Sequence, residues 1–368
     1  MTTNQTAIPF MQLRGGSSKG VYFRRDDLPD NQEQRDNVLK WVMGAYGDPR
    51  QIDGLGGADP LTSKIAIVSK SERPDCDIDY LFVQALVGED KLDDSPNCGN
   101  ILAGVGAFAL ESGLVQASGD NAEIRVFMEN SGKVCDVSFP LENNMPLYDG
   151  DTEINGVFGK AAEVMCHYSG LAGSMCGGLI PTGYMCNTFE GVRATCIDNG
   201  MPVVCLRAED FGLSGQESPE TLNANSALKE KLEKIRLQAG LAMGLADVSD
   251  KAVPKMCLVS KAVNGGHLNT RTFIPKVCHK AIGVLGAVSV ATAALFERGA
   301  IHDLAEIPEG LDKQMRIEHP SGHFDVQLEL NPERPGIDVL RAGLVRTARL
   351  ISRGEVYVPR SVWKGKNN

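Results

Sequence analysis

Short apolar and often β-branched runs alternate with glycines and prolines along most of the chain. Runs of this length between turn residues are typical of strands. The pattern predicts strands in KIAIVS from Lys64, YLFVQALV from Tyr80, EIRVFME from Glu123, VRATCID from Val192, PVVCLRA from Pro202, KMCLVS from Lys255 and FDVQLEL from Phe324.

Other segments show a helical pattern. Residues 35–46 and 227–240 combine an apolar stripe with charged positions, which predicts amphipathic helices. Residues 99–112 and 279–297 are apolar around nearly the whole circumference and rich in Gly and Ala. Because a helix that is apolar all round is buried on every side, we expect two similar halves of the α+β class, each a curved sheet around one buried helix. The division should lie near residues 174–190.

Composition and charge narrow the class of protein. The chain has 368 residues, a formal net charge of −10 and 42% hydrophobic residues. The length suits two domains. The acidic balance argues against nucleic acid and anionic membranes as partners, because both select a basic surface. The longest nearly charge-free stretch, residues 281–296, is shorter than the ~20 residues that a membrane span needs.

The ten cysteines are spread along the chain without a C-x-x-C pair. The first residues lack the charged and then apolar segments of a secretory signal. We therefore expect a cytoplasmic protein with reduced thiols, most of them small buried side chains.

Cys98 stands before the predicted helix 99–112, between Asn97 and Gly99. Unpaired N–H groups and the positive end of the macrodipole at a helix start favour a thiolate, which can act as acid, base or nucleophile. The alternative is a buried cysteine that begins a core helix.

Lys64 enters the apolar strand that follows Thr62 and Ser63. Desolvation disfavours an ammonium ion, so a lysine at this place could act as a base near neutral pH. The alternative is an exposed lysine at a strand end, with its stem along apolar surface.

Residues 14–20 (RGGSSKG) supply two cations, two hydroxyls and approachable backbone N–H groups, which suits an anion. The spacing is not that of a P-loop. The strand-like VYFR that follows argues against the nucleophile elbow suggested by G-x-S-x-G. The alternative is a tight hairpin turn in which Gly and Ser serve the backbone alone.

The second half offers a matching set of residues. Arg271 could hold a carboxylate through two hydrogen bonds. Cys278 precedes the predicted helix 279–297 as Cys98 precedes its own, so two bases across a cleft are one interpretation. The histidines form no pair at metal-ligand spacing, and no dinucleotide fingerprint lies between a predicted strand and a helix.

Six motifs together resemble the PrpF-type isomerase family, whose members have the diaminopimelate epimerase fold. The resemblance covers almost the whole chain. The motifs are RGGSSKG (14–20), QIDGLGGADPLTSK (51–64), NCGNILAGVG (97–106), CIDNGMPVV (196–204), NTRTFIPKVCHKAIGV (269–284) and EHPSG (318–322).

This resemblance implies two diaminopimelate epimerase-like domains, each a mostly antiparallel sheet or barrel around a central helix, with the active site in the cleft between them. The first domain would be residues 1–184, completed by the C-terminal strand 343–368, and the second would be residues 185–342. A homodimer is possible, since two-fold symmetry is the commonest.

The family pattern also implies an activity. Lys64 and Cys98 would be an acid/base pair for a keto–enol or allylic 1,3-proton shift, with no cofactor and no metal. The implied substrate is 4-oxalomesaconate, a tricarboxylate keto acid of gallate and protocatechuate breakdown. One alternative is that the substrate is 2-methylaconitate, of the methylcitrate pathway. The other is that the protein binds carboxylates without catalysis. The implied substrate-binding residues are Arg14, Ser17, Ser18, Lys19, Thr62, Ser63, Asn97, Gly99, Asn100, Arg271, Cys278, His279 and Ser321.

The chemistry is consistent with these residue types. Removing a proton beside a carbonyl or carboxylate leaves an enolate, which needs a base, a proton donor and fixed positive charge. Arg14, Lys19 and Arg271 would supply the charge. Cys278 is followed by His-Lys where the epimerases have Gly-Thr-Gly, which favours the lysine–cysteine pair over two cysteines.

Overall fold

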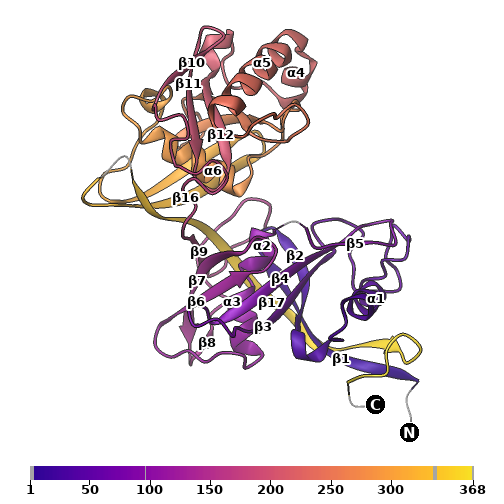
Figure 1. Ribbon diagram of the computed structural model, residues 1–368. Coiled ribbons are helices and arrows are strands. Elements are labelled where there is room, and N and C mark those ends of the chain that lie inside the picture. Colours follow the sequence, from indigo (N-terminus) through magenta and orange to yellow (C-terminus); the bar gives the residue numbers. More distant parts are fainter. Residues whose placement is uncertain (1–3, 96, 335–337, 367–368) are drawn as a thin grey trace. The chain divides into compact units, whose positions relative to one another are not determined.

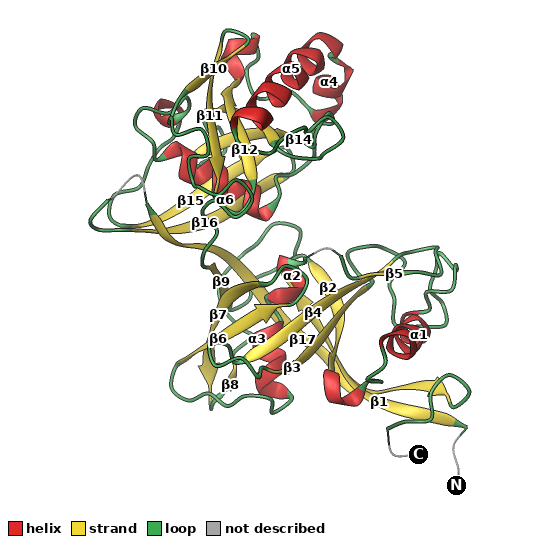
Figure 2. Ribbon diagram, viewed as in Figure 1, coloured by secondary structure: helices red, strands yellow, loops and turns green. Residues whose placement is uncertain are grey.

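The computed structural model describes residues 4–95, 97–334 and 338–366 (Figures 1 and 2). Its contacts divide the chain into two compact units. Unit 1 comprises Met1–His167 and Val345–Asn368, and unit 2 comprises Tyr168–Leu344. The sequence predicts this division at 184/185, with the C-terminal strand 343–368 in the first domain.

Unit 1 is built mainly from strands. They are β1 (Gln5–Gly15), β2 (Ser18–Arg24), β3 (Lys64–Lys70), β4 (Ile78–Ala85), β5 (Leu92–Asp93), β6 (Asn121–Met128), β7 (Lys133–Glu142), β8 (Met145–Pro146), β9 (Glu163–Tyr168) and the later part of β17 (Val339–Pro359). Their pairings close on themselves in the order β1, β2, β3, β4, β6, β7, β9, β17 and back to β1. The pairs β2–β3 and β4–β6 are parallel, so the sheet is mixed.

Three helices accompany these strands: α1 (Gln32–Met43), α2 (Gly99–Leu102) and α3 (Val105–Glu111), with a 3-10 turn η1 (Arg25–Asp27). α1 begins where the Asn31 side chain accepts a hydrogen bond from Gln34 N, and it ends at Gly44 in the left-handed conformation. Its apolar face packs on β1 to β4. α3 contacts β3, β6 and β7, and all its residues except Glu111 are buried, as expected for a helix that is apolar all round.

The single helix predicted over 99–112 is confirmed only in part, because the structure divides it into α2 and α3 with a turn between them. Gly104 N donates to Ile101 O, a three-residue bond that interrupts the α-helical pattern. Tyr22 Oη donates to the same carbonyl at 2.7 Å. A Cβ at Gly104 would lie 2.5 Å from that hydroxyl oxygen, so the glycine allows the chain to bend around Tyr22.

Unit 2 has its strands in one row from β10 to β17. They are β10 (Asn187–Phe189), β11 (Val192–Asp198), β12 (Pro202–Arg207), β13 (Lys255–Ser260), β14 (Leu268–Phe273), β15 (Asp312–His319), β16 (Gly322–Leu330) and the start of β17. The pairs β12–β13 and β14–β15 are parallel and the other pairs are antiparallel.

The helices of unit 2 are α4 (Pro219–Ala224), α5 (Ser226–Ala242) and α6 (Val284–Ala294), with 3-10 turns η2 (Ala208–Phe211) and η3 (His302–Leu304). α5 contacts β10 and β13 and buries residues such as Leu232 and Ile235 against them. α6 contacts β11, β12, β15 and β16, and its residues from Gly286 onward are buried. Each unit therefore has one buried helix and one amphipathic helix on its strands.

The helix predicted over 279–297 is shorter than expected, because α6 begins only at Val284. The residues before it form a turn that is fastened to β14. Ile274 N donates to Val277 O, and His279 N donates to Thr272 O at 2.8 Å. These two bonds fix residues 274–279 beside the strand, so they cannot join the helix.

The predicted strands are confirmed within a few residues, and the helices 35–46 and 227–240 are confirmed as α1 and α5. The molecule is an α+β protein with a mixed sheet and few helices. Its two diaminopimelate epimerase-like domains stay a prediction. Across the described residues, no helix has the length and apolar character that a bilayer span requires.

Candidate active site

Lys64 lies inside unit 1 at the first position of β3. It is paired with Gly20 of β2 on one side and with Gln84 of β4 on the other. Lys64 is only 8% exposed, which excludes the exposed strand-end lysine. Its Nζ donates to Gln84 Oε1 at 2.7 Å and lies 5.1 Å from the centroid of the Phe82 ring. The amine is therefore held in a desolvated place by two neutral groups.

Cys98 is half-buried and immediately precedes α2. Its carbonyl accepts a hydrogen bond from Leu102 N at 3.1 Å and one from Tyr80 Oη at 3.3 Å. α2 is a single turn, so the macrodipole expected from a long helix is small here. What still favours a reactive thiol is the first turn of the helix, whose N–H groups have no partner within the helix.

Asn100 joins the Cys98 turn to the β1–β2 hairpin. Its side-chain nitrogen donates to Oγ of Ser17 at 3.2 Å and to Oγ of Ser18 at 3.3 Å. A Cβ at Gly15 would lie 2.3 Å from the Asn100 carbonyl oxygen, so a larger residue would push the two segments apart. Two motifs that are far apart in the sequence thus form one surface of unit 1.

Gly20 allows α2 and the start of β3 to approach the β1–β2 hairpin closely. A Cβ there would lie 2.9 Å from Cδ1 of Ile101 in α2 and 3.0 Å from the carbonyl oxygen of Lys64. Lys19 N also donates to Leu61 O at 2.9 Å, just before β3. The structure therefore gathers in unit 1 the segments that carry Arg14, Ser17, Ser18, Lys19, Thr62, Ser63, Lys64, Asn97, Cys98, Gly99 and Asn100.

Residues 14–20 form a hairpin turn in which Arg14 and Lys19 are cross-strand partners. Their side chains therefore leave the same face. One terminal nitrogen of Arg14 donates to the carbonyls of Gly16 and Thr347 and to the Thr347 hydroxyl, at 2.8 to 3.0 Å. Burial, and then the positive charge of Arg349, lower the pKa of Arg14. Arg14 fastens the hairpin to β17 while adding positive charge beside Lys19.

Thr62 and Ser63 brace the loop before β3. Ser63 is fully buried, and its Oγ donates to Gln51 Oε1 at 2.5 Å. The same Gln51 oxygen accepts from Ala58 N at 2.9 Å, and Thr62 Oγ1 donates to Asp59 O at 3.2 Å. These bonds fix the loop conformation that places Lys64 at the start of the strand.

Of the two predicted residues on either side of Cys98, Asn97 is exposed and Gly99 begins α2.

Unit 2 carries a pocket of about 370 Å³. It is lined by Gln216, Glu217, Ser218, Pro219, Glu220, Arg271, Lys280, Pro320 and Ser321. The Glu217 carboxylate accepts hydrogen bonds from Ser214 N, Ser214 Oγ and Gly215 N at 2.8 to 2.9 Å, so its charge is already satisfied. Arg271 and Lys280 are the cations that this pocket offers to an anion.

Arg271 is held rigidly in this pocket and is 6% exposed. Its Nε donates to Glu217 O at 2.7 Å, and one terminal nitrogen donates to Asn269 Oδ1 and Thr270 O at 3.0 and 2.9 Å. Burial lowers the pKa of Arg271. The other terminal nitrogen has no hydrogen-bond partner among the described residues, so a ligand carboxylate could accept from it.

Cys278 does not mirror Cys98. It forms an isolated bridge with Phe273, ahead of α6, and is 3% exposed. Burial raises the pKa of Cys278 to about 11, so the thiol is protonated at neutral pH. The neighbouring His279 is exposed, and its Nδ1 lies 3.2 Å from Ala281 O. Cys278 therefore does not lie at the start of α6 as the sequence predicted, whereas a role for it as a second base stays a prediction.

His319 and Ser321 meet beside the pocket of unit 2. Ser321 Oγ donates to Lys280 O at 2.7 Å and lies 3.2 Å from Nδ1 of His319. Burial, and then the nearby His323, lower the pKa of His319 to about 4. A neutral imidazole at physiological pH leaves the positive charge of this region to Arg271 and Lys280.

Gln84 is the residue at the site that the sequence reasoning missed. Its signal was present, because a glutamine interrupts the otherwise apolar run YLFVQALV. Only the cross-strand register shows that this glutamine faces Lys64.

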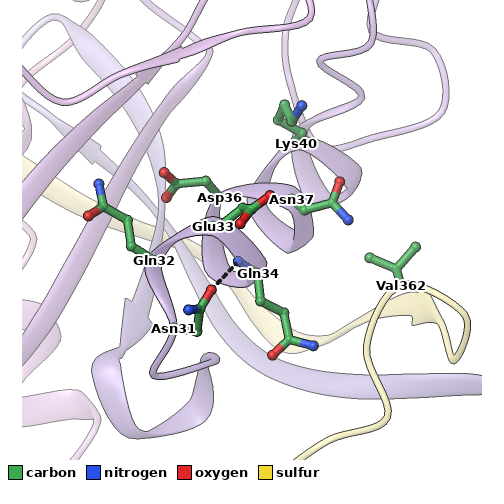
Figure 3. A pocket seen from close by; sticks show the side chains of 8 residues that line it. All are labelled: Asn31, Gln32, Glu33, Gln34, Asp36, Asn37, Lys40 and Val362. Carbon is green, nitrogen blue, oxygen red and sulfur yellow. Dashed lines mark hydrogen bonds between the residues drawn. The ribbon is translucent and has the colours of Figure 1, made fainter.

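A larger open depression of about 1000 Å³ lies elsewhere on unit 1 (Figure 3). The labelled side chains come from Asn31, which caps α1, from α1 itself as far as Lys40, and from Val362 near the C-terminus. It contains none of the predicted site residues. Across residues 4–95, 97–334 and 338–366, no three His, Cys, Asp or Glu side chains are grouped as metal ligands.

Comparison with known proteins places the chain in a family. The model of the family described as "PrpF protein" matches residues 5–359. A 4-oxalomesaconate tautomerase of Pseudomonas putida is 53% identical over 98% of this chain and 99% of that protein. A (4E)-oxalomesaconate Delta-isomerase of Novosphingobium sp. is 49% identical over 96% of this chain and 98% of that protein.

More distant relatives cover the chain equally well. A 2-methyl-aconitate isomerase of Shewanella oneidensis is 34% identical over 97% of this chain and 98% of that protein. The crystal structure of a methylitaconate-delta-isomerase superposes with a TM-score of 0.89 at 32% identity, covering 98% of this chain and 97% of that one. The chain belongs to the PrpF family, and it is an isomerase.

Proposed function

We propose that this isomerase catalyses a keto–enol or allylic 1,3-proton shift on 4-oxalomesaconate, in the breakdown of gallate or protocatechuate. The observation that carries the proposal is the buried side chain of Lys64, on a strand that pairs with β2 of the cationic β1–β2 hairpin, where Gly20 approaches Ile101 of α2. The 53% identity to a 4-oxalomesaconate tautomerase over nearly the whole chain supports this substrate.

Lys64 and Cys98 are the proposed acid/base pair. One of them takes a proton from the carbon beside a carbonyl or carboxylate, and the electron pair of that C–H bond moves into the conjugated system as an enolate. The other returns a proton at the oxygen or at the allylic carbon, so the substrate is rearranged without change of formula. Acid–base catalysis by positioned groups contributes about 10²–10⁴ in rate.

The cations have a separate task in this proposal. Arg14 and Lys19 add fixed positive charge where the enolate forms, and donors already in place need no reorganisation during the reaction. In unit 2, Arg271 and Lys280 are proposed as carboxylate-binding residues of their own pocket. The Asn100 bonds to Ser17 and Ser18 keep the hairpin next to the Cys98 turn.

The direct test follows 4-oxalomesaconate by NMR in D2O without added cofactor. The wild-type enzyme should introduce deuterium and form the tautomer. Lys64→Met and Cys98→Ala should each reduce turnover by about 10²–10⁴ while the circular dichroism spectrum is retained. Lys70→Met, at the exposed end of the same strand, and Cys76→Ala are matched controls that should keep full activity.

The outcomes separate the candidates. Full activity in Cys98→Ala or Lys64→Met would refute the proposed pair. Faster turnover of 2-methylaconitate would favour the second candidate, which the 34% identity to a 2-methyl-aconitate isomerase supports. Binding of either acid without deuterium uptake would show a carboxylate-binding protein instead.

A further inference from the structure

The side chain of Gln84 makes four hydrogen bonds, one through its oxygen and three through its nitrogen. Its side-chain oxygen accepts from Lys64 Nζ at 2.7 Å. Its side-chain nitrogen donates to the carbonyls of Pro60, Ser63 and Ala85, at 3.1, 2.9 and 3.1 Å. Three acceptors surround the nitrogen, and one cationic donor faces the oxygen. These partners determine which end of the amide is oxygen and which is nitrogen.

We propose that Gln84 is the positioning residue that holds the Lys64 amine at its reacting place without adding charge. This inference rests on the proposed function, in which Lys64 exchanges a proton with the substrate. The loop carbonyls fix the amide, and the amide oxygen then fixes the amine. Lys64 is a flexible side chain with four rotatable bonds, so without such a partner its nitrogen would occupy several places.

The neutrality of Gln84 matters as much as its geometry. A carboxylate at the same distance would stabilise the ammonium ion, so less of Lys64 would be present as the free amine that can accept a proton near neutral pH. The other close group is the uncharged ring of Phe82. On the far side of Gln84, Asp93 of β5 is its register partner, and the Asp93 carboxylate accepts hydrogen bonds from Ser95 N and Oγ. Among the described residues, no carboxylate forms an ion pair with Lys64.

Two substitutions separate positioning of Lys64 from bracing of the loop. Gln84→Met and Gln84→Glu both remove the donors to the three carbonyls, so any loss of loop bracing is common to both. Only Gln84→Glu keeps an oxygen acceptor for Lys64, and that oxygen is charged. The comparison is therefore between two variants with the same structural defect and different partners for the amine.

In Gln84→Met, kcat should fall about tenfold to a hundredfold, because a misplaced reacting group costs up to about 10² in rate, while KM changes by less than about threefold. In Gln84→Glu, the acidic limb of the kcat/KM profile should shift upward by about one pH unit or more relative to Gln84→Met. Gln84→Asn keeps a neutral amide in a fold-compatible form and should lose kcat without this shift. Gln327→Met, a half-buried glutamine on β16, is the control and should match the wild type.

Identical pH profiles for Gln84→Met and Gln84→Glu would overturn the positioning role, as would a wild-type kcat in Gln84→Met. If both variants fail to fold, Gln84→Asn decides, because an unchanged kcat there refutes the inference. Lys64→Met keeps the two proposals apart. If Lys64→Met retains turnover, the proposed base is wrong; if it is inactive and the Gln84 variants behave as controls do, only the role of Gln84 is wrong.

Discussion

In each unit a cysteine lies a few residues before the buried helix, α3 or α6, yet the two cysteines have different surroundings. Cys98 is half-buried and directly precedes α2, whereas Cys278 is 3% exposed and separated from α6 by a fastened turn. Burial keeps the Cys278 thiol protonated at neutral pH. A similar sequence pattern therefore gives one half-buried cysteine and one that belongs to the core.

The cations of the two units differ in the same way. Lys64 is held through its nitrogen by one neutral oxygen and an aromatic ring. Arg271 is fixed through two of its nitrogens by backbone and amide oxygens, which leaves the third for an anion. A lysine can change its protonation state near neutral pH when desolvated, whereas an arginine stays charged. On this difference the proposed function assigns proton transfer to Lys64 of unit 1 and carboxylate binding to Arg271 of unit 2.

Replacing each cysteine by serine tests the difference between Cys98 and Cys278 most directly. Cys98→Ser should lose about 10²–10⁴ in kcat, as expected for a proton donor or acceptor. Cys278→Ser should keep kcat within about threefold and lose about 1 kcal/mol of unfolding free energy, a common cost of a buried substitution. Steady-state kinetics and urea denaturation measure the two effects. Equal losses of kcat in both variants would restore the two-cysteine interpretation.

Arg271→Gln tests the task assigned to unit 2. A hydrogen bond to a charged group is worth about 1.5–3 kcal/mol, so KM should rise about tenfold to a hundredfold with a smaller change in kcat. Arg298→Gln, exposed after α6, serves as the control. An unchanged KM in a folded Arg271→Gln variant would remove this pocket from the site.

The smallest expected effect concerns the stability of unit 2 in acid. The pKa of His319 is lowered from 6.5 to about 4, so between these pH values the unfolded chain binds a proton that the folded chain does not. Stability should therefore fall as the pH drops through this window, by about 2 kcal/mol after allowance for partial solvent screening. Above pH 6.5 the contribution vanishes.

Comparison with a variant isolates the His319 contribution from that of the carboxyl groups. His319→Gln lacks the titrating ring, so the wild type should lose about 2 kcal/mol relative to it between about pH 7 and pH 4.5. Urea denaturation at both pH values measures this difference, and His279→Gln is an exposed control. A stability difference that is the same at both pH values would contradict the prediction.

The sequence predicted strands better than it predicted the ends of the buried helices. Runs such as KIAIVS carry their own signal, because β-branched residues between turns fit a sheet in almost any context. The break at Gly104 depends on Tyr22, and the late start of α6 depends on bonds from β14. Those partners lie far away in the sequence, so local pattern could not place either boundary.

The sequence predicted those residues of the candidate site whose chemical type and surrounding motif point to the same role. Lys64, Cys98 and the Arg14 to Gly20 turn could be selected because an amine, a thiol and an anion-binding turn each have a local chemical signal. Gln84 interrupts an apolar run, but this does not assign it a role, since a glutamine in a strand can face solvent, a neighbour or a ligand. Its importance became visible only when the β3–β4 register placed it opposite Lys64.

The sequence by itself determined the strand pattern, the α+β class and the set of reactive side chains, because short-range periodicity and side-chain chemistry are written locally. Tertiary structure alone decided which cysteine is accessible, which cation keeps a free donor and which neutral oxygen holds the lysine. Burial and hydrogen-bond partners arise from segments distant in the chain, and they set the properties that an acid, a base or an anion site needs.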